Sequence, residues 1–143
     1  ALAAEAVVFF DPARAAGMAS RRKRGGHLVS KHRYIAAQML AYLDVGLWLD
    51  LARRANAAAA RLAARLGAAG IHPAWPVQAN EIFVALPPDA DARLRAAGAQ
   101  YYPWPREAFP EGVPADYKPS RLVTSYATAD ADVDRFAALA QGS

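Results

Sequence analysis

The chain has 143 residues, no cysteine and a formal net charge of +4, from 17 basic and 13 acidic side chains. This length suits one ordinary domain or two small lobes, and a hydrophobic content of 55% is enough for a core, although its many alanines bury little area. The composition excludes disulfides, thiolate metal sites and a cysteine nucleophile, and no apolar run approaches the ~20 residues of a bilayer span, so we expect a cytoplasmic protein without a membrane partner.

The first predicted elements are a strand and a helix. Residues 6–10 (AVVFF) are consecutively apolar and predict a short buried strand. A buried strand at the start of a chain that lacks an initiator methionine indicates a fragment of a longer protein. Asp11 and Pro12 then have the chemistry of an N-cap and a first helical residue, so residues 12–23 are expected to be helical until a pair of glycines ends the helix.

Positive charge is concentrated between residues 12 and 43, where the chain has no acidic residue. A local field of this kind is typical of an anion site, a nucleic-acid patch or an interface. The sequence RRKRGGH could bind phosphate through its guanidinium and ammonium groups, although a solvated basic face has the same composition. The basic residues of this stretch are Arg14, Arg21, Arg22, Lys23, Arg24, Lys31 and Arg33.

The longest helical signal covers residues 30–70. Apolar side chains recur there every three or four residues, the period of a helix that buries one stripe, and alanine, leucine and arginine are strong helix formers. Residues 44–46 (DVG) interrupt the run, so we predict two helices or one bent helix, with a second arm over residues 47–66 that is about 30 Å long. The stripe consists of Leu40, Leu43, Leu47, Leu51, Ala55, Ala58, Leu62 and Leu66.

After residue 70 the pattern changes to short elements separated by prolines, which predicts a small α+β lobe packed on a sheet. The proline-rich residues 105–120 are expected to form a surface loop. The final helix should be capped by Thr128 or Asp130. The expected strands are residues 80–86, 99–104 and 121–126, the expected helix between them is 89–97, and the apolar face of the final helix is Val133, Phe136, Ala137 and Ala140.

Few residues qualify as candidates for chemistry. The sequence has no glycine-rich phosphate loop, nucleophile elbow or HExxH motif. Arg121 opens an apolar strand after a long loop, where its guanidinium could fork onto a substrate carboxylate, although an arginine at a strand edge is more often solvated. His27, His32 and His72 lie far from any acidic pair at ligand spacing, so no metal site is expected.

Two further groups have a plain structural interpretation. The aromatic residues between 101 and 117 are typical of core and loop packing. The acidic residues of the final helix are expected to do no more than favour a helix N-terminus. These groups are Tyr101, Tyr102, Trp104, Phe109 and Tyr117, and Asp130, Asp132 and Asp134.

Taken in order, five segments resemble the C-terminal portion of the low-specificity threonine aldolases, which are pyridoxal-phosphate (PLP) lyases of the aspartate-aminotransferase fold, fold type I. The segments are AEAVVFFDP, RRKRGGHLVSKHRYIAAQMLAYL, LWLDLARRANAAAARLAARL, QANEIFVALP and RLVTSYATADADVD, and they span essentially the whole chain. The resemblance implies an α/β fold with α+β character in this chain. Residues 1–43 would end the large PLP-binding domain, residues 44–70 would form a long connecting helix, and residues 71–143 would form a small C-terminal domain.

The resemblance also implies site residues. The family's Schiff-base lysine would lie upstream of Ala1, so we expect no catalytic residue in this chain and no activity from the chain alone. Lys23 and Arg33 would bind pyridoxal 5′-phosphate, and Arg121 would bind the substrate carboxylate. The full-length protein would be a homo-oligomer, a dimer or tetramer, that cleaves L-threonine, allo-threonine and related β-hydroxy-α-amino acids to glycine and an aldehyde.

Two alternatives stay open at this point. The first is another fold-type I PLP lyase or an aminotransferase. The second is a basic α+β module that binds nucleic acid or an acidic partner through residues 14–33. The position of Arg121 after a proline-rich loop favours the enzyme, because a nucleic-acid module has no need of it.

Overall fold

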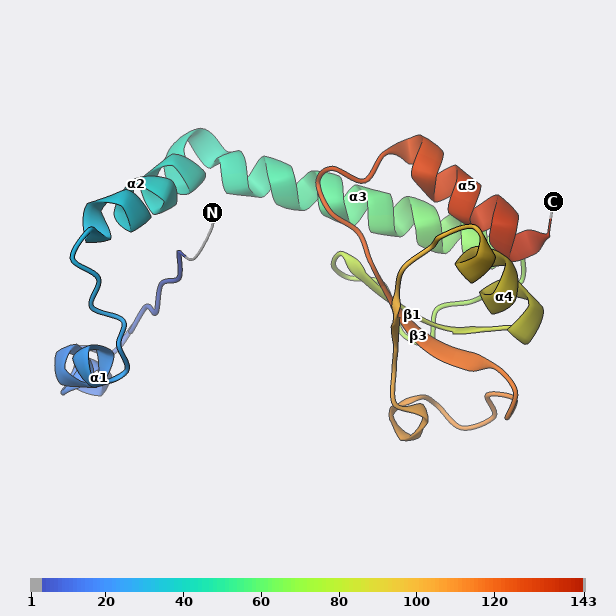
Figure 1. Cartoon of the computed structure of the whole chain (residues 1–143), viewed down its shortest axis with the longest axis horizontal. Helices are drawn as coiled ribbons and strands as arrows, with labels where there is room; N and C mark the ends of the chain where they lie inside the picture. Colours follow the sequence, from blue (N-terminus) through green and yellow to red (C-terminus); the bar gives the residue numbers. More distant parts are fainter. Residues whose placement is uncertain (1–3, 143) are drawn as a thin grey trace. The chain divides into compact units, whose positions relative to one another are not determined.

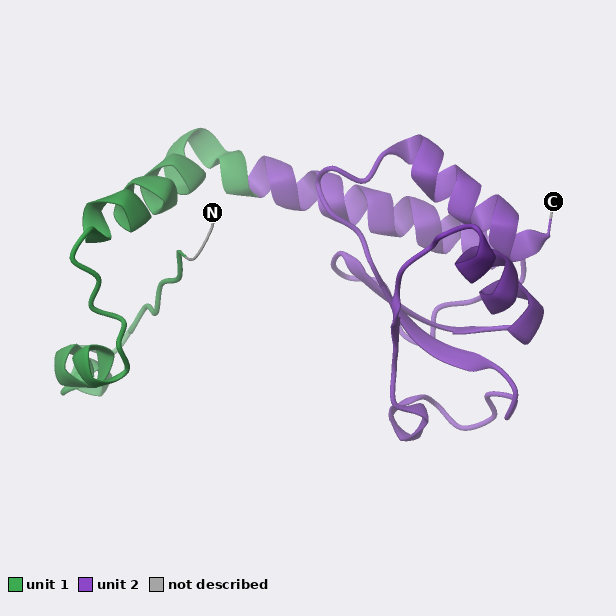
Figure 2. Ribbon diagram, in the orientation of Figure 1, with its two compact units in different colours: residues 1–48 green, residues 49–143 purple. Residues whose placement is uncertain are grey.

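The computed structural model describes residues 4–142 and divides into two compact units, Ala1–Trp48 and Leu49–Ser143 (Figures 1 and 2). The boundary between the units falls inside the longest helix, α3 (Leu47–Ala68). The division into an end of a PLP-binding domain, a connecting helix and a small domain stays a prediction.

The first unit consists of short helical segments. Residues 12–23, predicted as one helix, form two pieces, the 3-10 helix η1 (Pro12–Ala15) and the helix α1 (Met18–Arg24). Gly17 separates them because it adopts a left-handed conformation, with φ 75°. The predicted N-cap is confirmed, since the Asp11 carboxylate accepts a hydrogen bond from the Ala13 N–H at 3.0 Å. No side chain in the described part of this unit is buried.

The strand predicted over residues 6–10 is wrong. These residues have no regular secondary structure, and Val7, Val8 and Phe10 are 74%, 72% and 99% exposed. A strand exists only where its backbone pairs with a neighbour, and the sheet of the described structure is built from residues of the second unit alone. The apolar run predicted a buried strand, and both the burial and the strand are absent from the described structure of these residues.

The predicted hinge is confirmed. Helix α2 (His32–Leu43) ends at a 3-10 turn, η2 (Asp44–Gly46), and α3 begins at Leu47. Val45 lies at φ 44° and Gly46 at φ 77°. The left-handed region is costly for a β-branched residue, so the backbone of the turn is strained at Val45.

By length and composition, the helical run His32–Ala68 would be enough to cross a membrane, with a mean hydropathy of 1.3 in its most apolar window. The sequence argument, which looked for an uninterrupted apolar run, did not anticipate this. The observation is weak evidence for a membrane span, because core helices of soluble proteins pass the same test. That window is 0% buried, so it does not include the part of α3 in which Ala59 and Leu66 are fully buried.

The second unit contains an antiparallel sheet of three strands in the order β1-β3-β2, which confirms the predicted α+β character. Alternate residues of β1 (Ile82, Val84 and Leu86) are fully buried, and Leu122 of β3 pairs with Ile82 and faces the same way. Side chains of all three helices of this unit join them in one core. The elements are β1 (Glu81–Leu86), β2 (Tyr102–Pro103), β3 (Lys118–Val123), α4 (Pro88–Ala96), α5 (Asp130–Gln141) and the 3-10 helix η3 (Arg106–Ala108).

Within the described residues of the second unit, the three α-helices therefore pack against one face of the sheet, and no α-helix of this unit lies on the other face, called here the helix-free face (Figure 1). Helix α3 lies on the covered face through small side chains, Ala58 and Ala59, which allow a close approach. The end of β3 is fixed to α3 by Thr124, whose buried hydroxyl donates a hydrogen bond to the Ala55 carbonyl at 2.8 Å.

Three predicted boundaries are corrected. The last strand starts three residues earlier than predicted, at Lys118, because β3 pairs with β1 along all six of its residues. The strand predicted over residues 99–104 is reduced to Tyr102–Pro103. The N-cap of α5 is Ala129, so neither Thr128 nor Asp130 caps it; the Thr128 hydroxyl instead accepts a hydrogen bond from the Ser125 N–H at 2.9 Å.

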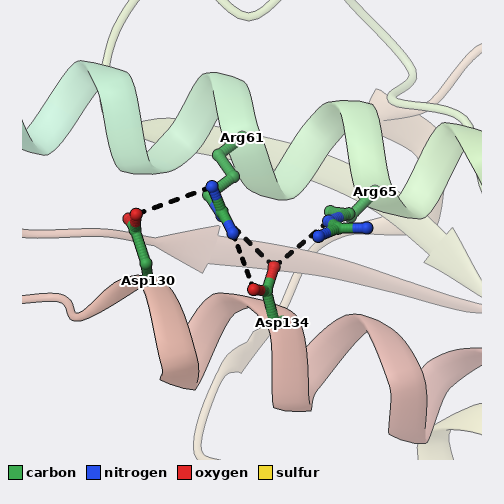
Figure 3. A network of polar contacts seen from close by, with 4 residues as sticks. All are labelled: Arg61, Arg65, Asp130 and Asp134. Atoms are coloured by element: carbon green, nitrogen blue, oxygen red, sulfur yellow. Dashed lines mark hydrogen bonds and ion pairs between the residues drawn. The ribbon is translucent and has the colours of Figure 1, made fainter.

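Ion pairs join α5 to α3 (Figure 3). Asp134 accepts hydrogen bonds from Arg61 at 2.6 and 3.2 Å and from Arg65 at 3.1 Å, and Asp130 lies 3.5 Å from Arg61. The hydrogen bond from Arg61, with the charges of Arg61 and Arg65, holds the pKa of Asp134 below its usual value. The expectation that Asp130 and Asp134 only favour a helix N-terminus is therefore wrong.

The C-terminal end of α5 is held by an arginine from α4. Arg93 donates to the carbonyls of Leu139 at 2.9 Å and Ala140 at 2.8 Å, and to the Asp89 carboxylate at 2.7 Å. A cation at this end of a helix satisfies carbonyls that lack an intrahelical donor and is favoured by the helix dipole. The predicted apolar face of α5 is confirmed, since Val133, Ala137 and Ala140 are buried and Phe136 packs against the core.

Candidate carboxylate-binding site

The helix-free face of the sheet carries a row of side chains centred on Arg121. Phe83 of β1 and Tyr102 of β2 both pair with Arg121 of β3. Directly paired residues project to the same face, so the three side chains form one row across the sheet. Trp104 follows β2, and its ring centroid lies 5.0 Å from that of Phe83.

Two aromatic rings contact the Arg121 guanidinium. Its Cζ lies 5.6 Å from the ring centroid of Tyr102 and 5.3 Å from that of Trp104. Both distances are within the range at which the negative face of a ring attracts a cation. The rings can therefore orient the guanidinium without using any of its N–H donors.

Most of the hydrogen-bonding capacity of Arg121 is unused. A guanidinium carries five N–H donors, and no hydrogen bond from this one to another described residue is present. Its Nε is buried without a partner, and its terminal Nη1 lies 3.5 Å from the Glu81 carboxylate, beyond the 2.7–2.9 Å usual for a charge-assisted hydrogen bond. The side chain is 30% exposed, so an acceptor from solution can reach it.

The aromatic row continues away from Arg121 toward the proline-rich loop. Trp75 meets Phe83 edge-on at 5.4 Å and Phe109 at 5.2 Å. The loop is ordered by Arg106, which donates to the carbonyls of Pro114 and Ala115, each at 3.1 Å. A pocket of about 620 Å³ lies at this end; its lining includes His72, Ala85, Phe109, Glu111, Val113 and Tyr117.

Sequence reasoning singled out Arg121 but missed what surrounds it. Tyr102 and Trp104 were assigned to packing, yet both contact the guanidinium, and Glu81 was not considered at all. The i, i+2 spacing of the two rings was the available signal, because it places them on one face of an extended segment. The packing interpretation is confirmed for Tyr101 and Phe109, each 8% exposed.

Tyr101 is an aromatic residue whose contacts serve packing and not the Arg121 row. Its hydroxyl donates to the Asp91 carboxylate at 2.5 Å, and the Arg95 guanidinium lies 4.1 Å from its ring centroid. Burial, followed by the contact with Asp91, raises the pKa of Tyr101, so the phenol stays neutral at physiological pH. These contacts attach residue 101 to α4 and leave it no role at the Arg121 row.

The two predicted cofactor residues lie in the first unit, whereas Arg121 lies in the second. Lys23 is in the last turn of α1 and Arg33 in the first turn of α2; both side chains are exposed. Neither has an ion pair or hydrogen bond to a side chain within residues 4–142. Their donors suit a phosphate, and Arg33 lies at the helix end where the dipole favours an anion. No group of three or more potential metal ligands occurs among the described residues.

No family model matches this chain, but two curated proteins and a solved structure do. The low specificity L-threonine aldolase of Pseudomonas aeruginosa is 39% identical over 100 residues, which are 68% of this chain and 29% of that protein. The protein of the same name from another Pseudomonas strain is 33% identical over 99 residues, again 68% and 29%. The threonine aldolase structure from Leishmania major matches with a TM-score of 0.65 and 28% identity, over 76% of this chain and 30% of that one. The chain thus spans about 30% of the length of these relatives.

Proposed function

We infer that this chain, a relative of the low-specificity L-threonine aldolases over the segment that it spans, supplies the substrate-carboxylate site of a PLP-dependent carbon–carbon lyase. The proposed reaction is the cleavage of L-threonine, allo-threonine and related β-hydroxy-α-amino acids to glycine and an aldehyde. The observation that carries the proposal is Arg121, a partly exposed guanidinium that two rings contact and that donates no hydrogen bond to another described residue.

Arg121 would bind the α-carboxylate through two parallel N–H···O bonds. A guanidinium matches the geometry of a carboxylate in this way, whereas an ammonium offers only a point charge. The rings of Tyr102 and Trp104 would help to orient the fork, and with it the bound amino acid. Orientation of this kind supplies much of the advantage of a bound over a free reactant.

The remaining roles rest on the family resemblance. PLP, when bound, accepts the electron pair of the Cα–Cβ bond that breaks. Lys23 and Arg33 would hold its phosphate by charge-assisted hydrogen bonds, and their donor chemistry and exposure support this assignment. The lysine that binds the cofactor covalently would precede residue 1. We further propose that the whole protein is a homo-oligomer, a dimer or tetramer, associated through the basic first unit.

Replacement of Arg121 tests the proposal. In the full-length protein, Arg121→Lys and Arg121→Ala should each lower kcat/KM for L-threonine about ten- to a hundredfold, because a charge-assisted pair contributes about 1.5–3 kcal/mol and lysine cannot reproduce the fork. Cofactor absorbance should be unchanged. Arg135→Lys, an exposed arginine of α5, is the control and should behave as the unmodified enzyme.

A normal kcat/KM in Arg121→Ala would eliminate the proposed role. Assays with a panel of α-amino acids separate the aldolase from another lyase or an aminotransferase of the same fold. All of these would require a carboxylate site, but only the aldolase would release glycine from threonine.

A further inference from the structure

Glu81 is the only acidic residue in the described part of the chain that pairs with Arg121. It begins β1, where it pairs with Val123, while Arg121 pairs with Phe83. Glu81 and Arg121 are therefore diagonal neighbours on the helix-free face, at a separation that long side chains can bridge.

The contact between them is loose. The Glu81 Oε1 to Arg121 Nη1 distance of 3.5 Å is longer than a hydrogen bond of this type, and the Glu81 side chain is 42% exposed. The contacts of Asp134 with Arg61 and Arg65, at 2.6 and 3.1 Å, show how an arginine–carboxylate pair closes in this same fold. Glu81 can leave Arg121 for solvent without breaking another ion pair or hydrogen bond between its side chain and the described residues.

We propose that Glu81 is an internal carboxylate that occupies Arg121 when no substrate is bound and is displaced by the α-carboxylate of the substrate. The proposal rests on the function proposed above for Arg121. It adds that substrate binding is an exchange of one carboxylate for another. Glu81 would thus lower the affinity of the site for any anion.

The fork of Arg121, once Glu81 has left, favours carboxylates. A bidentate carboxylate gains two short hydrogen bonds, whereas a spherical anion such as chloride gains no paired geometry. Because Glu81 reduces the fraction of the site that is free, it would lower the apparent affinity for both kinds of ligand by the same factor.

The test is Glu81→Gln in the full-length protein, which keeps the shape of the side chain and removes its charge. The KM for L-threonine and the dissociation constant of glycine should each fall by about two- to fivefold, the range typical of an exposed ion pair, while kcat stays the same. Inhibition by chloride should become stronger. Glu107→Gln, which removes an exposed carboxylate outside the Arg121 row, is the matched control and should change none of these values.

Three outcomes are distinguishable. If Arg121→Ala has normal kinetics, the proposed function fails and this inference fails with it. If Arg121→Ala weakens binding but Glu81→Gln leaves KM unchanged or raises it, the exchange is wrong and Arg121 keeps its role. If both effects appear, Glu81→Gln should have no effect in the Arg121→Ala background, because the group that it occupies is gone.

Discussion

Residues 4–48 and residues 49–142 have similar apolar content in their helices but differ in what covers it. In the second region, the stripe of α3 is buried at Ala55, Ala58, Leu62 and Leu66. In the first, the same stripe is exposed, with Leu40 at 72%. The period of a sequence thus identifies which face of a helix is apolar, but burial depends on whether a partner lies against that face.

The difference also concerns what holds each region together. The second region has its own core, cross-strand pairs and the Asp134 ion pairs, whereas the described part of the first has helices without a buried side chain. Helical stability in proteins comes mainly from packing rather than from propensity. The two regions should therefore respond very differently to isolation and to substitution.

Separating the regions should give the largest effect. A polypeptide of residues 49–143 should fold alone and show one cooperative thermal transition, because it contains all the buried residues of the described structure. A polypeptide of residues 1–48 should show no cooperative transition in circular dichroism. Cooperative melting of the shorter peptide as a monomer would contradict the comparison.

A pair of leucine substitutions compares the regions residue by residue. Leu66→Ala removes a fully buried side chain and should lower the free energy of unfolding by about 2–5 kcal/mol. Leu40→Ala makes the same change at a position that is 72% exposed and should stay within about 0.5 kcal/mol. Urea titrations of both variants measure the difference, and equal losses would mean that Leu40 is covered in solution.

A smaller effect is expected where the end of β3 meets α3. Thr124→Val keeps the shape of the side chain but removes the buried hydroxyl that donates to the Ala55 carbonyl. The free energy of unfolding should fall by about 0.5–1.5 kcal/mol, the net value of such a hydrogen bond. Stability equal to the unmodified chain would show that the Ala55 carbonyl does not depend on this donor.

The smallest effect should depend on pH. The pKa of Asp134 is lowered in the folded state, so its carboxylate contributes stability above the unfolded value of about 3.9, and this contribution is lost as pH falls through the lower folded value. Asp134→Asn should therefore be less stable than the unmodified chain at neutral pH and equal to it in strong acid. Added salt should reduce the neutral-pH difference.

Asp132→Asn is the control for this experiment, since Asp132 lies in the same helix without an ion pair among the described residues. Its stability should follow that of the unmodified chain at all pH values. A pH-independent loss in Asp134→Asn would point to a packing defect instead of an ion pair.

The parts of the fold that could be predicted from the sequence have local signals. Glycine and aspartate at residues 44–46 marked the hinge, alternation marked β1, and the helical period marked α3, because each signal lies within the element that it describes. The strand at residues 6–10 failed because its formation depends on a neighbour. The start of β3 was misplaced because its register with β1 decides it, and the N-cap of α5, Ala129, lies one residue from either predicted cap.

Only one residue of the candidate carboxylate-binding site, Arg121, could be predicted from the sequence. Arg121 stood out by its position before an apolar strand, and the structure adds the rings and the carboxylate that surround it. Those partners come from positions 40 residues earlier and 17 to 19 residues earlier in the sequence, at Glu81, Trp104 and Tyr102. Only the pairing of the three strands brings them together, and no local pattern encodes that pairing.

The alanines of α3 determine which sequence changes this fold can accept. Ala59 is fully buried and Ala58 is 5% exposed, and both face the core. A larger side chain at either position would force the helix away from the sheet, at a cost of about 1–3 kcal/mol. Substitutions that evolution accepts at these two alanines are therefore limited by a maximum side-chain size. Substitutions at Leu62 and Leu66, one and two turns further on, are limited by a minimum size, because a smaller side chain would leave a cavity.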